Sequence, residues 1–191
     1  YKANTQWPLS GPYRVYVLLL VQPEGRNAIR LCTSLLRDQF TPKGSHMIVL
    51  RGYQSQAIHD VFAAWRAGHR SVVMVAPTGS GKRSIAVWLM NYAAEAGRRV
   101  LFVGNRRLLI SQAQADSEKH GVDYGVIMAD SETGNPASTN QLASIQTLES
   151  WYFKERFVGL TGRGLPPADL VMVDEVHQEE SRYRQLLSFY P

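Results

Sequence analysis

The feature that most constrains the fold is a short apolar run that leads directly into a glycine-rich turn. Residues Ser71 to Val75 form the run, and Ala76-Pro77-Thr78-Gly79-Ser80-Gly81-Lys82 follow it. A run of this length, followed by a turn and a helical pattern from about Gly81 to Ala96, is typical of a buried parallel strand that passes into a helix. Such a unit needs a parallel sheet with helices against it, so we predict an α/β protein.

The turn has the composition of a phosphate-binding loop. Gly79 and Gly81 let backbone N–H groups turn inward around an anion, the helix N-terminus adds a positive end, and Lys82 can reach β- and γ-phosphates. The preceding strand and the following helix are the context in which this glycine pattern predicts a nucleotide site rather than an ordinary turn. The predicted phosphate contacts, for ATP as the cofactor, are Pro77, Thr78, Gly79, Ser80, Gly81, Lys82, Arg83 and Ser84.

Arg83 departs from the usual pattern, in which a Ser or Thr hydroxyl after the lysine ligates Mg²⁺. Ser84 comes one position later, and one residue along a helix rotates a side chain by roughly 100°, so Ser84 does not replace that hydroxyl. Two interpretations are open: the metal is held through water and carboxylates from elsewhere, or catalysis is impaired. Arg83 itself is interpreted either as a phosphate contact or as a solvated arginine on the helix surface.

A second strand end carries the acidic partners of this loop. Leu170 to Val173 is an apolar run that ends in Asp174 and Glu175. The carboxyl ends of parallel strands share one edge of the sheet, so these carboxylates and the phosphate loop are expected to meet. We predict that Asp174 holds Mg²⁺ and that Glu175 accepts a proton from the attacking water.

Downstream of Met47, helical patterns alternate with short β-branched runs, which predicts a parallel sheet covered by helices on both faces. The predicted strands are 71–75, 100–103, 124–128, 142–145 and 170–173. The predicted helices are 54–67, 81–96, 106–119 and about 147–157. Residues 131–139 and 159–167 are rich in Gly, Pro, Ser and Thr and are expected to be loops.

The first part of the chain differs in character. Residues 44–47 spell Gly-Ser-His-Met, a common remnant of a cleaved tag, and coincidence, a fusion, or translation upstream of a true start at Met47 are all open explanations. One strand, Tyr13 to Val21, and one helix, Glu24 to Phe40, are predicted there. We predict a boundary between residues 1–46 and a partial nucleotide-binding lobe at 47–191, with the first segment dispensable for the nucleotide site.

Composition narrows the cellular setting and the partners. Lys and Arg total 21 against 16 Asp and Glu, which gives a formal charge of +5 and favours polyanionic partners. The longest apolar run, residues 15–21, is far shorter than the ~20 residues of a membrane-spanning helix. The single cysteine, Cys32, allows no intrachain disulfide. These features, together with the lack of a secretory signal pattern, predict a cytoplasmic protein without a membrane partner.

From Met47 to His177 the order of these motifs resembles the superfamily 2 helicases and translocases, close to the DEAD/DEAH-box proteins and the helicase subunits of restriction systems. The resemblance implies a RecA-like P-loop NTPase lobe that is incomplete at its C-terminus. Leu50 to Ile58 resembles the family's glutamine motif, which implies that Gln54 reads the adenine edge and that Tyr53 packs nearby. Asp174-Glu175-Val176-His177 resembles its DEAH box with Val in place of Ala, which implies that His177 links the ATP state to a second lobe.

Two further stretches resemble the family's strand-contacting motifs. The stretch from Val103 to Gln112 implies that Arg106 meets a nucleic-acid phosphate and that Gln112 supports the loop or helix. The stretch from Ser144 to Leu148 implies that Gln146 and Thr147 lie against the same backbone. Donors of this kind at strand ends bind phosphates without reading bases, so DNA or RNA is expected to bind without sequence specificity.

The leading functional prediction is the ATP-binding lobe of a nucleic-acid-dependent ATPase or helicase, which couples hydrolysis to unwinding or translocation. The resemblance implies that the coupling strand and a second RecA-like lobe, the source of the arginine finger, are missing from this chain. We therefore expect the fragment to bind nucleotide better than it hydrolyses it. Two alternatives are a hydrolysis-deficient NTP-binding module, supported by Arg83, and a P-loop NTPase unrelated to nucleic acid.

Overall fold

The structure is a computed structural model that describes residues 15–21 by their backbone and residues 48–77, 79–129, 135, 137–150 and 165–190 in full. In chain order the elements are β1 (Val15–Val21), α1 (Gly52–Arg66), β2 (Ser71–Ala76), α2 (Lys82–Glu95), β3 (Val100–Gly104), α3 (Arg107–Lys119), β4 (Gly125–Ile127), β5 (Asn140–Ser144), α4 (Ile145–Leu148), β6 (Leu170–Asp174), the 3₁₀ helix η2 (Val176–Gln178) and α6 (Glu180–Ser188).

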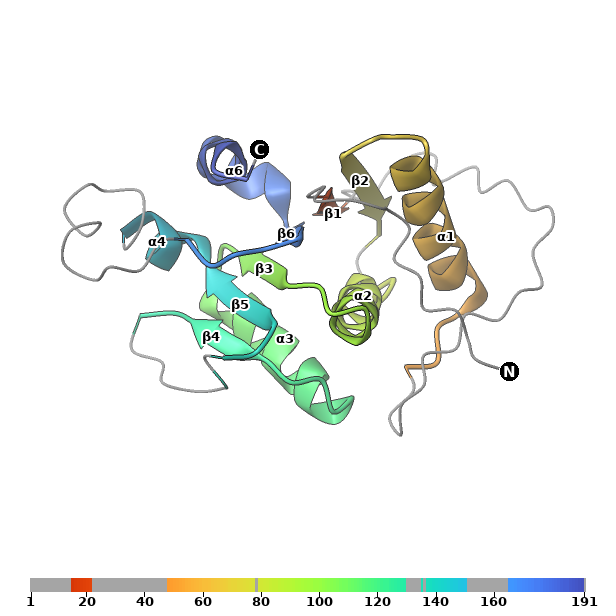
Figure 1. The fold of residues 1–191 in the computed structure, drawn as a ribbon, viewed down its shortest axis with the longest axis horizontal. Coiled ribbons are helices and arrows are strands. Elements are labelled where there is room, and N and C mark those ends of the chain that lie inside the picture. The colour runs from red at the N-terminus through yellow and green to blue at the C-terminus, as the bar shows by residue number, and fades with distance from the viewer. Residues whose placement is uncertain are drawn as a thin grey trace.

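The centre of the fold is a sheet of six strands in the order β2-β1-β6-β3-β5-β4 (Figure 1). Every pair of neighbouring strands runs parallel. All carboxyl ends therefore lie along one edge, where β2 passes into the glycine-rich turn and β6 ends at Asp174. The predicted α/β class with a parallel sheet is confirmed.

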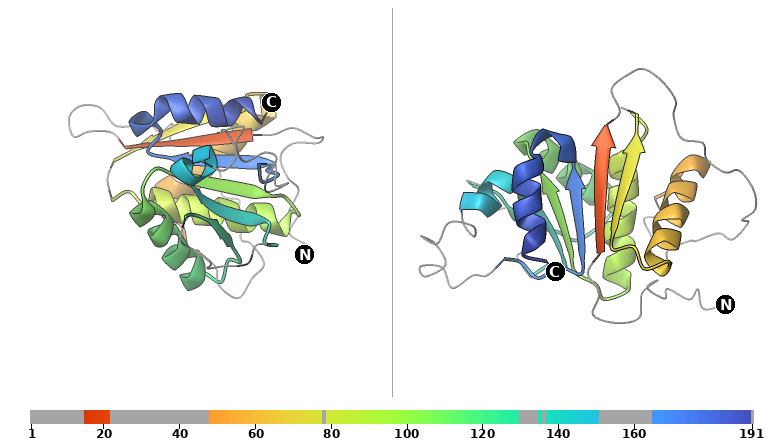
Figure 2. Two further views of the ribbon diagram at one scale, coloured as in Figure 1. Left: turned by 90° about the vertical axis from the view of Figure 1, so that its left-hand side faces the viewer. Right: turned by 90° about the horizontal axis from the view of Figure 1, so that it is seen from above.

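Helices cover both faces of the sheet, as predicted from the alternating pattern (Figure 2). One apolar cluster joins side chains of α1, α2 and α3 to the sheet, and a second joins those of α4 and α6 to the opposite face. The residues of β3 and β6 are all buried, which explains their continuous apolar sequence, because a central parallel strand contacts a helix layer on each face. Within the described ranges, no helix combines the length and apolar character that crossing a membrane requires.

Most predicted elements lie within a few residues of the observed ones. The predicted helix from Glu24 to Phe40 falls on residues that the structure does not describe, as do most of residues 130–136 and all of 151–164. The helix predicted at 147–157 overlaps only the end of α4, so most of it lies outside the described residues.

Strand β1 lies inside the sheet, although residues 1–46 are predicted to be dispensable for the nucleotide site, and that dispensability stays a prediction. It is predicted as a strand from its apolar run, but its position in the sheet is not. Its backbone pairs with β2 on one side, from Tyr16↔Ser71 to Val21↔Ala76, and with β6 on the other, from Val15↔Leu170 to Leu19↔Asp174. Among the described strands, β1 is the only neighbour of β2. The strand before the glycine-rich turn is therefore joined to the strand that carries Asp174 through β1.

We expect removal of residues 1–46 to destabilise this chain, because β2 would lose the ladder that joins it to the sheet. Backbone hydrogen bonds contribute about 1 kcal/mol each, so the free energy of unfolding should fall by at least about 3 kcal/mol. Leu18→Pro removes one backbone donor from the same ladder and should act in the same direction. Urea unfolding followed by circular dichroism measures both effects. An unchanged midpoint for a chain that begins at Met47 would contradict the role of β1.

Candidate functional site

The turn after β2 has the backbone that a phosphate loop requires. Gly79 and Gly81 adopt φ values of 77° and 75°, which residues with a side chain rarely adopt. The turn is closed by a hydrogen bond from the Ser80 amide to the Pro77 carbonyl at 3.2 Å, and α2 begins directly after it at Lys82. Thr78 lies outside the described residues. In the described part of the chain the buried Oγ of Ser80 finds no hydrogen-bond partner.

Lys82 folds back onto this turn. Its Nζ donates to the carbonyl oxygen of Ala76 at 3.2 Å and to that of Pro77 at 3.4 Å. An ammonium group has three donors, and neutral carbonyls are weaker acceptors for it than phosphate oxygens. The position of the ammonium on the loop therefore suits the binding of an anion at the start of α2.

Gln54 holds the loop from the side of α1. Its side chain is 4% exposed, and its Nε2 donates to the carbonyls of Ser80 at 3.1 Å and Gly81 at 3.3 Å. Its Oε1 accepts from the amide of Arg51 at 2.8 Å, which caps the start of α1. Tyr53 supports the same contact, because its hydroxyl donates to the Ser80 carbonyl at 2.8 Å. In this structure Gln54 therefore fixes the loop, and its reading of an adenine edge stays a prediction.

A cavity of about 290 Å³ opens beside this contact, between α1 and β2. Tyr53 and Ser80 line one part of it, and valine side chains of β2 line another. Tyr53 is 39% exposed, so its ring is accessible for packing against a flat ligand.

The two carboxylates at the end of β6 lie in different environments. Asp174 is 4% exposed, and burial, followed by the charge of Glu175, raises its pKa above the usual value. The amide of Glu175 and the charges of Lys82 and Arg83 act in the opposite direction. Glu175 is partly exposed, has a left-handed backbone with φ of 52°, and lies with its Oε2 3.6 Å from the Nδ1 of His177.

The donor set suits Mg²⁺ bound together with phosphates better than a metal held by protein alone. No group of three or more His, Cys, Asp or Glu side chains that could hold a metal occurs among the described residues. Mg²⁺ keeps several waters and takes one or two carboxylates plus substrate phosphates. A buried carboxylate whose pKa is raised by burial also gains from a nearby cation, so Asp174 and Glu175 fit this role.

Arg83 points away from the loop. Its guanidinium donates to the Oε1 of Gln112 and lies 3.5 Å from the carboxylate of Asp116, both on α3. The side chain is 40% exposed, so it is only partly solvated, and these two contacts are with α3 rather than with the glycine-rich turn. Gln112 is thereby placed as a partner of the helix that follows the glycine-rich turn, and the phosphate contact of Arg83 stays a prediction. Ser84 occupies the next position on α2, half-buried beside Gly81.

The predicted strand-contacting residues lie at the same carboxyl edge. Arg106 is the exposed N-cap residue of α3 at the end of β3. Next to it, Leu108 is 63% exposed. Gln146 is exposed at the end of β5, whereas Thr147 is 5% exposed and its Oγ1 accepts from the amide of Ala129 at 3.0 Å. Contacts of these residues with a nucleic-acid backbone stay predictions.

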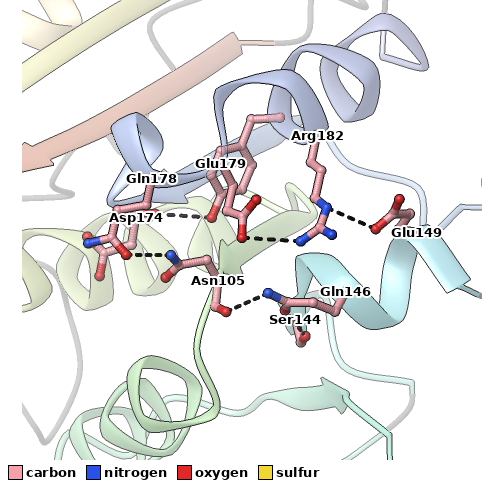
Figure 3. Close-up of polar contacts among 9 residues, drawn as sticks. Asn105, Ser144, Gln146, Glu149, Asp174, Gln178, Glu179 and Arg182 are labelled. Atoms are coloured by element: carbon pink, nitrogen blue, oxygen red, sulfur yellow. Dashed lines mark hydrogen bonds and ion pairs between the residues drawn. The ribbon is translucent and has the colours of Figure 1, made fainter.

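Two residues that the sequence analysis did not single out connect these strand ends. Asn105 donates from its Nδ2 to the Oε1 of Gln178 at 2.6 Å, and its carbonyl accepts from the Nε2 of Gln146 at 2.7 Å (Figure 3). The ends of β3, β5 and β6 are thus joined by side-chain hydrogen bonds. The only sequence signal was position, because Asn105 directly precedes Arg106 and Gln178 directly follows His177.

Comparison with known proteins agrees with this geometry. Residues 47–191 match the protein family described as type III restriction enzyme, res subunit. Over 149 residues the chain is also 26% identical to a type I restriction enzyme EcoAI endonuclease subunit from Escherichia coli, and this similarity covers 73% of the chain and 18% of that protein. The chain therefore spans a small part of the length of this relative. All the site residues described above lie within the matched range.

The two glycines of the loop make a matched pair of tests. A Cβ on Gly81 would lie 2.3 Å from the Nε2 of Gln54, whereas a Cβ on Gly79 would meet no described atom within 4 Å. Both positions have positive φ, which costs a residue with a side chain about 1–2 kcal/mol. We expect Gly81→Ala to lower the free energy of unfolding by this amount plus the cost of displacing Gln54, and Gly79→Ala by the backbone cost alone. Equal losses in thermal or urea unfolding would contradict the close contact with Gln54.

Proposed function

The chain belongs to the family of the type III restriction enzyme res subunit, and on this premise we propose that it binds ATP and couples ATP hydrolysis to movement along, or unwinding of, nucleic acid. The fold is a superfamily 2 helicase lobe of the RecA-like kind. The observation that carries the proposal is the position of the loop and the carboxylates at one edge of the sheet. Through β1, Ala76 before the loop and Asp174 at the end of β6 are held in register with Val21 and Leu19.

The phosphates of ATP are proposed to lie on the turn at the start of α2. The amides of the loop and of the N-terminus of α2 offer donors and a positive dipole. The ammonium group of Lys82, which contacts the carbonyls of Ala76 and Pro77, would move from them to the phosphates. Tyr53, exposed beside the loop, is the residue against which we place the adenine. Gln54 positions the loop through the Ser80 and Gly81 carbonyls.

Mg²⁺, when bound with ATP, neutralises charge on the β- and γ-phosphates. Asp174 and Glu175 are the residues that would hold it, directly or through water. We further propose that Glu175, the more exposed carboxylate, accepts the proton of the attacking water, while Lys82 keeps the γ-phosphate in position. The Nδ1 of His177 lies 3.6 Å from the Oε2 of Glu175, so a change in the charge or position of that carboxylate would act on His177 in the turn that follows β6.

The nucleic acid is proposed to bind along the carboxyl edge of β3 and β5. Arg106 supplies an exposed charge at the start of α3, and Gln146 lies exposed at the end of the neighbouring strand. These groups can meet phosphates without distinguishing bases, which supports binding to DNA or RNA without sequence specificity. The similarity to a type I restriction enzyme endonuclease subunit leads us to propose DNA rather than RNA as the substrate.

A second candidate is a nucleotide-binding lobe without hydrolysis. The observation in its favour is Arg83, which replaces a metal-binding hydroxyl and instead contacts Gln112 and Asp116. Nucleotide binding is common to both candidates, so turnover in the presence of nucleic acid distinguishes them.

We expect Lys82→Ala to weaken the binding of a fluorescent ATP analogue at least about a hundredfold. The loss of a charged donor to phosphate costs about 3 kcal/mol, which corresponds to that change in Kd. Lys119→Ala removes an equal charge from the last turn of α3 and serves as the control. If Lys82→Ala bound the analogue as tightly as the control, the assignment of the phosphate site would be wrong.

We expect Arg106→Ala to weaken the binding of single-stranded oligonucleotides of different sequence to the same extent. The loss of one phosphate contact should also reduce the slope of log K against log salt concentration by about 1. Fluorescence anisotropy at several salt concentrations measures both quantities. Arg184→Ala on α6, whose side chain is 79% exposed, is the matched control and should leave the slope unchanged. A loss confined to one sequence would contradict a backbone contact.

A further inference from the structure

The turn after Asp174 is held in a backbone conformation that few residues adopt. Glu175 has φ of 52° and ψ of 45°, and it is the single non-glycine residue with positive φ among the described residues. Its amide donates to the Oδ1 of Asp174 at 3.0 Å. Such a conformation persists only where the surroundings hold it. A ligand that changes the hydrogen bond between Asp174 and Glu175 therefore acts on the first residue of this turn.

The other end of the turn contacts the neighbouring strand. The 3₁₀ helix η2 ends at Gln178, whose Oε1 accepts from the Nδ2 of Asn105 at 2.6 Å (Figure 3). Asn105 also connects to β5, because its carbonyl accepts from Gln146, whose own Oε1 accepts from the hydroxyl of Ser144 at 2.7 Å. Asn105 thus links the turn after β6, through its side-chain amide, to the segment that follows β5, through its backbone carbonyl.

Asn105 is placed to act on the start of α3. Its side chain is 9% exposed, and its buried Oδ1 has no hydrogen-bond partner in the described part of the protein. The hydrogen bond from its Nδ2 to Gln178 therefore helps to orient this side chain. The next residue, Arg106, is the N-cap of α3, so a change in Asn105 shifts the residue that presents the proposed phosphate contact.

The surroundings of the turn are fixed on the side away from Asn105. Arg182 of α6 lies 3.0 Å from the carboxylate of Glu149 and 3.2 Å from that of Glu179, which ties α6 to the segment after α4. The buried hydroxyl of Tyr183 donates to the carbonyl of Asp174 at 3.3 Å. β6 and α6 are thus both held by side-chain contacts, whereas Gln178 in the turn between them is exposed.

We propose that the hydrogen bond between Asn105 and Gln178 transmits the state of the nucleotide site to the nucleic-acid edge, with both residues acting as positioning residues. The proposal rests on the proposed function, because it requires that nucleotide and nucleic acid bind to the same chain. Binding of one ligand then changes the affinity for the other by the same factor, since coupling free energy is reciprocal.

The test measures this factor with defined probes. The Kd for a fluorescent single-stranded oligothymidylate is measured with and without saturating AMP-PNP and Mg²⁺, and the ratio of the two values is the coupling factor. We expect a factor of about five or more for the unchanged chain. Proximity alone does not establish coupling, so a double-mutant cycle on the two residues is required.

Replacing the side-chain amide of Asn105 or Gln178 by a carboxylate changes the hydrogen bonding but hardly changes the size of the side chain. In Gln178→Glu the carboxylate still accepts from Asn105, and in Asn105→Asp the carboxylate accepts from Gln178 after its amide rotates. The double variant places two ionised acceptors opposite each other and removes the bond. We expect each single variant to keep the coupling factor within about twofold of the unchanged chain, and the double variant to bring it close to one.

Gln178→Ala is the second test, because this exposed side chain can be removed without opening the core. It should also bring the coupling factor close to one while leaving the Kd for AMP-PNP alone within about twofold. Gln56→Ala removes an amide that donates to Asp60 at 2.9 Å on α1 and is the matched control, with an unchanged factor. Melting temperatures confirm that each variant is folded.

The outcomes separate the two proposals. If the unchanged chain binds neither probe, the proposed function fails, and this coupling fails with it. If the chain binds both probes but its coupling factor is one, or if the double variant and Gln178→Ala keep the factor of the unchanged chain, the coupling through Asn105 and Gln178 is wrong and the proposed function stands.

Discussion

The arrangement of the site depends first on the buried amide of Gln54. Its oxygen accepts a hydrogen bond from the backbone amide of Arg51 at the start of α1. Its nitrogen donates to the backbone carbonyls of Ser80 and Gly81 in the glycine-rich loop. Because all three partners are backbone groups, the distance between α1 and the loop is set by the size of a glutamine. Gly81 is then required for two reasons, its positive φ and the space that Gln54 occupies. The glycine and the glutamine are parts of one constraint, although they lie in separate stretches of the sequence.

The second constraint is electrostatic. Asp174 is buried at the end of an apolar strand, and burial raises its pKa, so its ionised form gains from every cation nearby. The charges of Lys82 and Arg83 on α2 provide part of that compensation. Strand β1 joins β2, which leads into the loop, to β6, which ends at Asp174, through its backbone pairing with both strands. The predicted nucleotide site is therefore built on two strands that β1 connects.

Local sequence patterns predicted the helices and strands well, whereas contacts between residues far apart in the sequence could not be predicted from them. The apolar runs of β2, β3 and β6 and the glycine-rich turn are readable because each reflects the environment of a few consecutive residues. The position of β1 depends on backbone pairing, which any apolar strand can satisfy, so its place between β2 and β6 had no signal. Asn105 and Gln178 are 73 residues apart and have ordinary polar side chains, so only the fold shows that they meet.

Arg83 shows how a departure from a family pattern can change the role of a position. An arginine cannot ligate a cation, so the position no longer contributes to metal binding. One residue along α2 from Lys82, its side chain turns toward α3 and contacts Gln112 and Asp116. It therefore joins α2, which begins at the predicted phosphate loop, to α3, which begins directly after Arg106. In the proposed function, the metal ligand that is absent next to the lysine would be replaced by Asp174, Glu175 and water, while Arg83 connects α2 directly to α3.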